Sequence, residues 1–248
     1  MSMSAVVPLK PGKKAGPVAV PGSGINGIVI MPAFNEAQDI AAVITAVRRE
    51  TALEVLVVDD ASTDETIQLA RQAGARVMSL SQNLGAWGAI QAGLRYACQN
   101  DFDFAMTMDA DGQHEAQWIN ELFAPVVSGE ADVSIGCCIR RGSRLRKIAW
   151  VLLKFTSGLK MEDITSGFRV YNRPAMELLS GREATLLEYQ DVGVLILLKN
   201  AGLRLQDVDV TMLPRTSGNS RVYSSWLVVA YYMAHTLLLG ITKRFSIR

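Results

Sequence analysis

Five short runs with strand character, alternating with segments of helical periodicity, restrict the folds that this chain can adopt. We expect strands at residues 25–31, 55–58, 76–80, 104–108 and 132–135. After the first run, apolar residues recur at helical spacing at Ile40, Val43, Ile44 and Val47. Repeated strand–helix units predict an α/β fold with a mainly parallel central sheet and helices on both faces.

Two later segments extend this pattern. Residues 192–200 predict a helix, and residues 203–212 predict a strand in which Asp207 and Asp209 face solvent. No Gly-x-Gly-x-x-Gly motif follows the first strand, so the usual dinucleotide-binding fingerprint is absent.

Composition narrows the functional classes. The 248 residues suffice for one large domain with a sizeable core. The 25 basic and 24 acidic residues nearly cancel, so nothing indicates a nucleic-acid partner. A hydrophobic content of 49% is typical of a well-buried α/β core or of membrane contact. The three cysteines form no disulfide framework and the early residues lack signal-peptide character, which together favour a cytosolic setting.

Acid-rich loops follow three of the expected strands, at residues 35–36, 59–60 and 109–111. Ligands of open α/β sheets collect at the carboxyl ends of strands, so these loops predict a site there. Clustered carboxylates repel one another unless a cation or hydrogen-bond donors lie between them. A cleft for a metal, a diphosphate and a sugar or ribose would meet that need. Asp60 is placed to accept hydrogen bonds from a base or ribose, whereas Phe34 could pack on a base or belong to the core.

The loop after the fourth strand is the candidate metal site. Asp109 and Asp111 are spaced so that both carboxylates can face one divalent cation, with Gln113 two residues further on. Mg²⁺ and Mn²⁺ prefer oxygen ligands, and Mg²⁺ usually bridges substrate phosphates. The alternative is a plain turn, because Asp and Gly are favoured in turns. His114 is a weak ligand candidate, since imidazole is not needed on Mg²⁺.

Four motifs in order resemble those of the family 2 glycosyltransferases, which have the GT-A fold, and two further motifs indicate a branch of that family. They stand at residues 32–36, 59–64, 83–85, 109–114, 163–169 and 215–221. The last two are similar to the branch of dolichyl-phosphate mannosyltransferases and polyprenyl-phosphate glycosyltransferases. The resemblance extends from about residue 25 to residue 221.

The resemblance implies a role for each matching residue. The cation, Mg²⁺ or Mn²⁺, would be held by Asp109, Asp111 and Gln113. The donor, a UDP- or GDP-linked hexose, would be bound by Pro32, Phe34, Glu36, Asp60, Ala110 and Arg221. Arg215 and Arg221 would stabilise the departing diphosphate, and Asp191 is the one plausible catalytic base. The reaction would be an inverting transfer to a polyprenyl phosphate.

Three departures from the family pattern bear on the donor and acceptor more than on the reaction type. The Gly-Ser-Arg expected after the fifth strand reads Gly136-Cys137-Cys138, so an expected arginine is missing or shifted to Arg140. The terminal Ser-Lys reads Ser220-Arg221, which keeps the charge but changes the geometry. Gly193 stands where relatives commonly have Glu.

The remaining segments suggest contact with a membrane. Residues 1–24 are rich in Pro and Gly and predict a disordered tail before a glycosyltransferase domain at 25–221. A basic run at 140–147 precedes an apolar stretch at 148–155. Residues 226–241 carry no charge but are shorter than the roughly 20 residues that span a bilayer, so 222–248 predict an interfacial helix. We therefore expect a peripheral protein on the cytoplasmic membrane face, with a membrane partner protein as a further candidate.

Two alternative functions stay open. A hydroxyl acceptor on a polysaccharide, glycolipid or small molecule would need a carboxylate base, whereas a phosphate is already anionic and needs arginines to guide it. The many arginines favour the lipid phosphate. The second alternative is a membrane-associated protein that binds sugar nucleotides without turnover.

Overall fold

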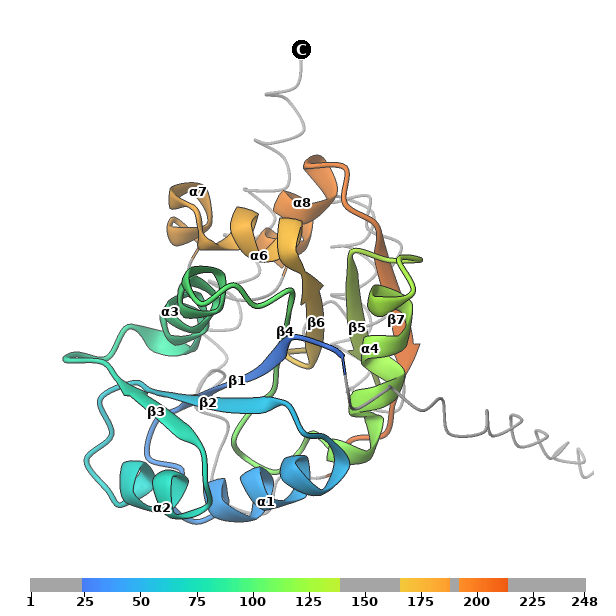
Figure 1. Ribbon diagram of the computed structural model, residues 1–248. Coiled ribbons are helices and arrows are strands. Elements are labelled where there is room, and N and C mark those ends of the chain that lie inside the picture. The colour runs from blue at the N-terminus through green and yellow to red at the C-terminus, as the bar shows by residue number, and fades with distance from the viewer. Residues whose placement is uncertain (1–23, 139–165, 188–191, 214–248) are drawn as a thin grey trace, which may run out of the picture.

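The computed structural model describes residues 24–138, 166–187 and 192–213. Within them, seven strands form one sheet in the order β3-β2-β1-β4-β6-β5-β7 (Figure 1). The strands are β1 Gly27–Ala33, β2 Glu54–Asp59, β3 Arg76–Ser79, β4 Phe104–Thr107, β5 Val133–Cys137, β6 Arg169–Asn172 and β7 Leu205–Asp209. The helices are α1 Ile40–Glu50, α2 Thr66–Gln72, α3 Gly85–Gln99, η1 Ala116–Trp118, α4 Ile119–Val127, α6 Arg173–Ser180, α7 Arg182–Thr185 and α8 Val192–Asn200.

The sheet is mainly parallel, as the alternation of elements predicts. β1 pairs in parallel with β2 and β4, β2 with β3, and β5 with β7. Only β6, among the described strands, runs the other way, and it pairs antiparallel with β4 and β5. The carboxyl ends of the six other strands therefore lie along one edge of the sheet.

Helices cover both faces because successive strand side chains point to opposite sides. One core contains Ile28, Ile30, Leu56 and Val58 with buried residues of α3, α6, α7 and α8. The other contains Val29, Met31, Val55 and Val57 with buried residues of α1, α2 and α4. The four apolar residues expected on the buried face of the helix after the first strand are all buried in α1. Figure 1 shows α1 and α2 below the sheet and α3 and α6 above it.

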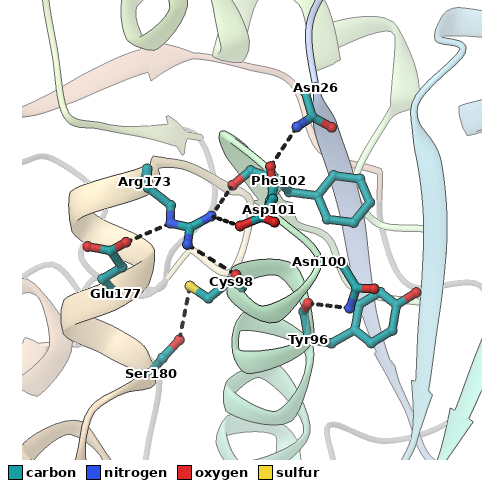
Figure 2. Close-up of polar contacts among 9 residues, drawn as sticks. All are labelled: Asn26, Tyr96, Cys98, Asn100, Asp101, Phe102, Arg173, Glu177 and Ser180. Carbon is teal, nitrogen blue, oxygen red and sulfur yellow. Dashed lines mark hydrogen bonds and ion pairs between the residues drawn. The ribbon is translucent and has the colours of Figure 1, made fainter.

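Hydrogen bonds from Arg173 connect the β6–α6 junction to the end of α3 (Figure 2). Its guanidinium donates to the Cys98 carbonyl at 3.1 Å and to the Phe102 carbonyl at 3.2 Å, and it pairs with Glu177 at 2.7 Å. The last carbonyls of a helix have no partner within the helix, so this arginine satisfies one of them. The contact lies at the sheet edge opposite the acidic loops, where α3 ends and β4 begins.

Several boundaries differ from those expected. The first strand is shifted by two residues, from 25–31 to Gly27–Ala33. The last is shortened from 203–212 to Leu205–Asp209, and the expectation that both its aspartates face solvent was wrong for one of them. Asp209 is exposed, whereas Asp207 is half-buried.

Several expected features fall outside the described residues. They are the tail at 1–24 apart from its last residue, the basic run at 140–147 with the apolar stretch after it, and the segment 222–248. Of the helices that the structure does describe, none combines the length and apolar character needed to cross a bilayer.

Candidate functional site

Three acidic loops meet at the carboxyl edge of the sheet. Ala33 at the end of β1 lies beside Asp59 at the end of β2, and the Asp60 N–H donates to the Ala33 carbonyl at 2.8 Å. On the other side of β1, the Met108 N–H donates to the Ile30 carbonyl at 3.1 Å. Parallel pairing thus brings the loops that carry Asp59 and Asp109, 50 residues apart in the sequence, to the same edge of the sheet.

The loops after β1 and β2 are joined by reciprocal hydrogen bonds. The Asn35 N–H donates to the Ser62 hydroxyl at 2.9 Å, and the Asn35 side chain accepts from the Thr63 N–H at 2.8 Å. The Glu36 N–H donates to the Thr66 hydroxyl at 2.8 Å. Asn35 and Ala61 have φ values of 53° and 64°, a left-handed conformation that disfavours most side chains. The two loops therefore hold each other in a fixed and locally strained shape.

Asp64 strengthens this junction through its charge. Burial by itself would raise the pKa of the Asp64 carboxyl. Hydrogen bonds from the Thr66 hydroxyl, from the Thr66 N–H and from the Ala37 N–H outweigh that effect, and the pKa lies below its ordinary value. Asp64 is therefore ionised near neutral pH and binds both loops.

The proposed donor residues differ in their exposure. Phe34 is one of the exposed large apolar side chains, so its ring is available to a ligand and does not belong to the core. Pro32 and Glu36 are half-buried. Asp60 is buried, and its Oδ1 accepts from the Leu84 N–H at 2.6 Å. One oxygen of that carboxylate therefore holds the start of α3.

The metal loop is a tight turn after β4. Gly112 has a φ of +75°, which glycine adopts without strain. The Gln113 N–H donates to Asp111 Oδ1 at 3.1 Å, two residues back, as in an Asx-turn. Ala110 and Asp111 are buried, Gln113 is half-buried, and the Asp109 side chain is 45% exposed. The residues proposed as metal ligands thus form a turn, so the turn and the metal site are compatible with each other.

These residues fit a hard divalent cation that a ligand helps to hold. Across the described part of the chain, no three His, Cys, Asp or Glu side chains are grouped as a complete metal cage. Two carboxylates and the amide of Gln113 on one loop supply oxygen donors. Mg²⁺ is commonly bound in this way, through one or two carboxylates plus substrate phosphates.

The segment 166–168 lies against the metal loop. The Thr107 hydroxyl donates to the Gly167 carbonyl at 2.7 Å. A Cβ on Gly167 would stand 3.1 Å from Asp109 Oδ1, so the absence of a side chain there leaves room for the carboxylate. The sequence reasoning missed this support, although Thr107 was visible as a lone hydroxyl within an apolar strand.

His114 is a buried neighbour of the cation site, and not an open ligand. Its Nδ1 accepts from the Asp109 N–H at 3.0 Å, and its side chain is only 1% exposed. Its ring stacks on Phe168 with centroids 4.8 Å apart.

Of the three departures from the family pattern, the cysteines after Gly136 and the glycine at 193 lie within the described residues, whereas Ser220-Arg221 lies outside them. A Cβ on Gly136 would meet Phe168 at 3.1 Å and Val210 at 3.2 Å, so a glycine fits this crowded position. Cys138, where an arginine was expected, is buried. Gly193 is half-buried in the first turn of α8.

Three proposed site residues, Asp191, Arg215 and Arg221, lie outside the described residues. The last described segment before Arg215 is attached to the metal loop. The Leu213 N–H donates to the Gln113 carbonyl at 2.9 Å, and His114 forms an antiparallel bridge with Met212.

Comparisons with known proteins agree with this architecture. The model of the family described as Glycosyl transferase family 2 matches residues 28–179. Polyprenol monophosphomannose synthase of Mycolicibacterium smegmatis is 28% identical over 217 residues, which cover 80% of this chain and 81% of that protein. Undecaprenyl-phosphate mannosyltransferase of Micrococcus luteus is 27% identical over 211 residues, covering 79% of this chain and 86% of the relative.

A solved structure extends the likeness to the fold. Glucosyl-3-phosphoglycerate synthase of Mycobacterium tuberculosis, in complex with Mn²⁺, uridine-diphosphate and phosphoglyceric acid, matches with a TM-score of 0.67 at 22% identity. The match covers 91% of this chain and 80% of that one. The family match spans more than half of the chain and includes all three acidic loops, so this chain belongs to glycosyl transferase family 2 and has the GT-A fold.

Proposed function

We propose that this protein transfers a hexose from a nucleoside diphosphate sugar to a polyprenyl phosphate, with inversion at the anomeric carbon and with Mg²⁺ or Mn²⁺ as cofactor. The observation that carries the proposal is the juxtaposition of the Asp109–Asp111 loop with the joined loops after β1 and β2. Relatives that match about four fifths of the chain, and are named for polyprenol and undecaprenyl-phosphate sugar transfer, support the acceptor class.

The donor nucleotide occupies the loops after β1 and β2. Phe34 supplies an exposed ring against the base, while Pro32 and Glu36 lie on the same loop. Asp60 is held rigidly by the Leu84 N–H, which leaves its second oxygen to accept from the nucleoside. The hydrogen bonds between the two loops preorganise this pocket, so little conformational entropy is lost on binding.

The diphosphate lies at the metal loop. Asp109, Asp111 and Gln113 hold the cation, and Ala110 between them is small enough for close approach of the donor. When bound, the cation neutralises charge that develops on the departing diphosphate. Arg215 and Arg221 add positive charge on the same side. Attachment of Leu213 to Gln113 supports this placement, because Arg215 is only two residues further along the chain.

The acceptor phosphate attacks in line and needs no general base, because it is anionic at neutral pH. Arginines guide it through charge-assisted hydrogen bonds. Asp191 takes the role of base only if the acceptor is a hydroxyl group. Asp191→Asn therefore distinguishes the two acceptor classes: lost chemistry with retained donor binding would argue for a hydroxyl acceptor.

The protein works at the cytoplasmic face of a membrane as a peripheral enzyme. The basic run at 140–147 and the uncharged stretch at 226–241 support this placement, since such segments meet anionic headgroups and the interface. A membrane partner protein would complete the surface that receives the lipid acceptor.

The test is transfer of label from UDP-glucose and from GDP-mannose into extractable lipid, with polyprenyl phosphate and Mn²⁺ or Mg²⁺ supplied. We expect labelled lipid with one donor, and loss of that product on chelation and in Asp111→Ala. Asp103→Ala is the matched control, because this exposed aspartate precedes the same strand at its opposite end and should leave transfer unchanged.

The other outcomes assign the alternatives. Donor hydrolysis without labelled lipid would indicate a different acceptor, namely a hydroxyl group on a polysaccharide, glycolipid or small molecule. Binding of sugar nucleotides without any turnover would support a non-catalytic protein. Equal activity in Asp111→Ala and the wild type would refute the proposed cation site.

A further inference from the structure

The side chain of Asp109 is partly exposed, while the neighbouring His114 and Phe168 are buried. Nearly half of the Asp109 side-chain surface is accessible. A flexible carboxylate would lose rotamer freedom when it binds a cation, and this loss would weaken binding. What holds Asp109 in place therefore influences how tightly the cation is bound.

We propose that His114 is a positioning residue that fixes both the backbone and the carboxylate of Asp109 for the cation. This inference rests on the proposed role of Asp109 as a metal ligand. The Asp109 N–H donates to His114 Nδ1 at 3.0 Å, and His114 Nε2 lies 3.7 Å from Asp109 Oδ2. One imidazole ring is thus hydrogen-bonded to the backbone of Asp109 and lies near its carboxylate, at a distance longer than a hydrogen bond.

The hydrogen bond also sets the chemistry of the ring. A nitrogen that accepts a hydrogen bond carries no proton, so the proton of the neutral ring is on Nε2. That N–H faces the Asp109 carboxylate. The arrangement resembles the support of metal ligands in other proteins, where groups behind the ligand orient it through hydrogen bonds.

The ring itself cannot turn away. It stacks on Phe168 with an angle of 11° between the planes, and Phe168 is completely buried. The His114 backbone pairs with Met212, and the neighbouring Gln113 carbonyl accepts from the Leu213 N–H. The packing thus fixes the ring, and the ring fixes Asp109.

Asp111 is held by a different device, the backbone N–H of Gln113 within the turn. Loss of the imidazole should therefore misplace one of the two carboxylates and leave the other in position. Removal of such supporting groups typically weakens metal binding by about 10- to 100-fold.

The experiment measures Mn²⁺ affinity by electron paramagnetic resonance with UDP present, so it needs no turnover. We expect His114→Ala to raise the Mn²⁺ Kd by about 10- to 100-fold. His114→Asn places an amide oxygen near the position of Nδ1 and can still accept from the Asp109 N–H, so it should restore part of the affinity. Trp118→Phe is the control, because it removes the hydrogen bond from Trp118 Nε1 to Thr211 on the neighbouring segment without touching Asp109.

Melting curves of all variants separate positioning from folding. A Mn²⁺ Kd within twofold of wild type in folded His114→Ala would overturn the inference. So would a Trp118→Phe variant that melts equally early and weakens Mn²⁺ binding as much. If the wild type itself binds no Mn²⁺, or if Asp111→Ala binds as tightly as the wild type, the metal site fails and the inference fails with it. If the wild type binds Mn²⁺ and both His114→Ala and His114→Asn bind it equally tightly, the metal site stands and only the inference about His114 is overturned.

Discussion

Replacing Gly93 by alanine should destabilise the fold, although alanine is the better helix former. Gly93 lies in the middle of α3, where the helix crosses β1. A Cβ at this position would stand 2.4 Å from Cγ2 of Ile30 and 3.3 Å from two further atoms of that side chain. Ile30 is completely buried and β-branched, so it has little freedom to rotate away. Helix and strand would have to separate by about 1 Å to reach an ordinary contact distance.

The magnitude follows from two opposing effects. Overpacking a buried site costs about 1–3 kcal/mol, and the short contact favours the upper half of this range. Replacing a helical glycine by alanine returns about 0.5–1 kcal/mol. The net free-energy loss of about 1–2.5 kcal/mol corresponds to a fall in Tm of about 2–10 °C for a domain of this size. Because the N–H of Leu84, just before α3, anchors Asp60, the KM for the donor should rise as well.

Thermal unfolding followed by circular dichroism measures this effect, and Gly193→Ala is the matched control. In α8 a Cβ would come within 3.0 Å of Leu187 Cδ2, which is the end of a flexible side chain. The leucine can move, so we expect Tm to change by less than about 2 °C. An unchanged or raised Tm in Gly93→Ala would refute the argument that close packing of α3 on β1 requires glycine.

Three further predictions concern charge, loop shape and membrane contact. The Arg204 side chain, chiefly by hydrogen bonding, holds the pKa of Asp132 below its ordinary value of about 3.8. The ionised Asp132 therefore stabilises the fold above the unfolded pKa. This stabilisation is lost as the pH falls through the folded pKa. Asp132→Asn should therefore lower Tm at pH 7, with a difference that shrinks below pH 4 in a melting series; a constant difference would contradict this. Asn35→Ala removes the acceptor for the Thr63 N–H and puts alanine at a φ of 53°. The KM for the donor should therefore rise severalfold in steady-state kinetics, with little change in kcat. An unchanged KM would count against the preorganised pocket. Replacing Arg140, Arg141 and Arg144 by Gln should lower the affinity for anionic vesicles by about 100-fold and reduce its salt dependence, because each charge contributes about 1 kcal/mol near such a surface. Vesicle flotation measures this affinity, and equal flotation of variant and wild type would place the membrane contact elsewhere.

The sequence alone determined the parallel part of the sheet and the edge at which the site lies. Buried strands in a parallel sheet are nearly continuous apolar runs, so residues 55–58 and 104–108 were recognisable without any partner. Chain direction then places the loops after these strands at the same edge, because parallel strands end together. The Asp109–His114 motif carried the candidate metal residues with it, since they are close in the sequence.

The tertiary structure decided what only long-range pairing can supply. β6 is four residues long and begins with an arginine, so no local pattern marks it as a central strand between β4 and β5. Asp207 is half-buried in the folded protein, although alternation alone predicts that it faces solvent. His114 shows the same limit. Its spacing suggested a weak ligand, whereas its burial against Phe168, more than 50 residues later in the chain, makes it a support for Asp109. Periodicity and motifs report on residues that are near in the chain, whereas burial and orientation depend on which distant segments pack together.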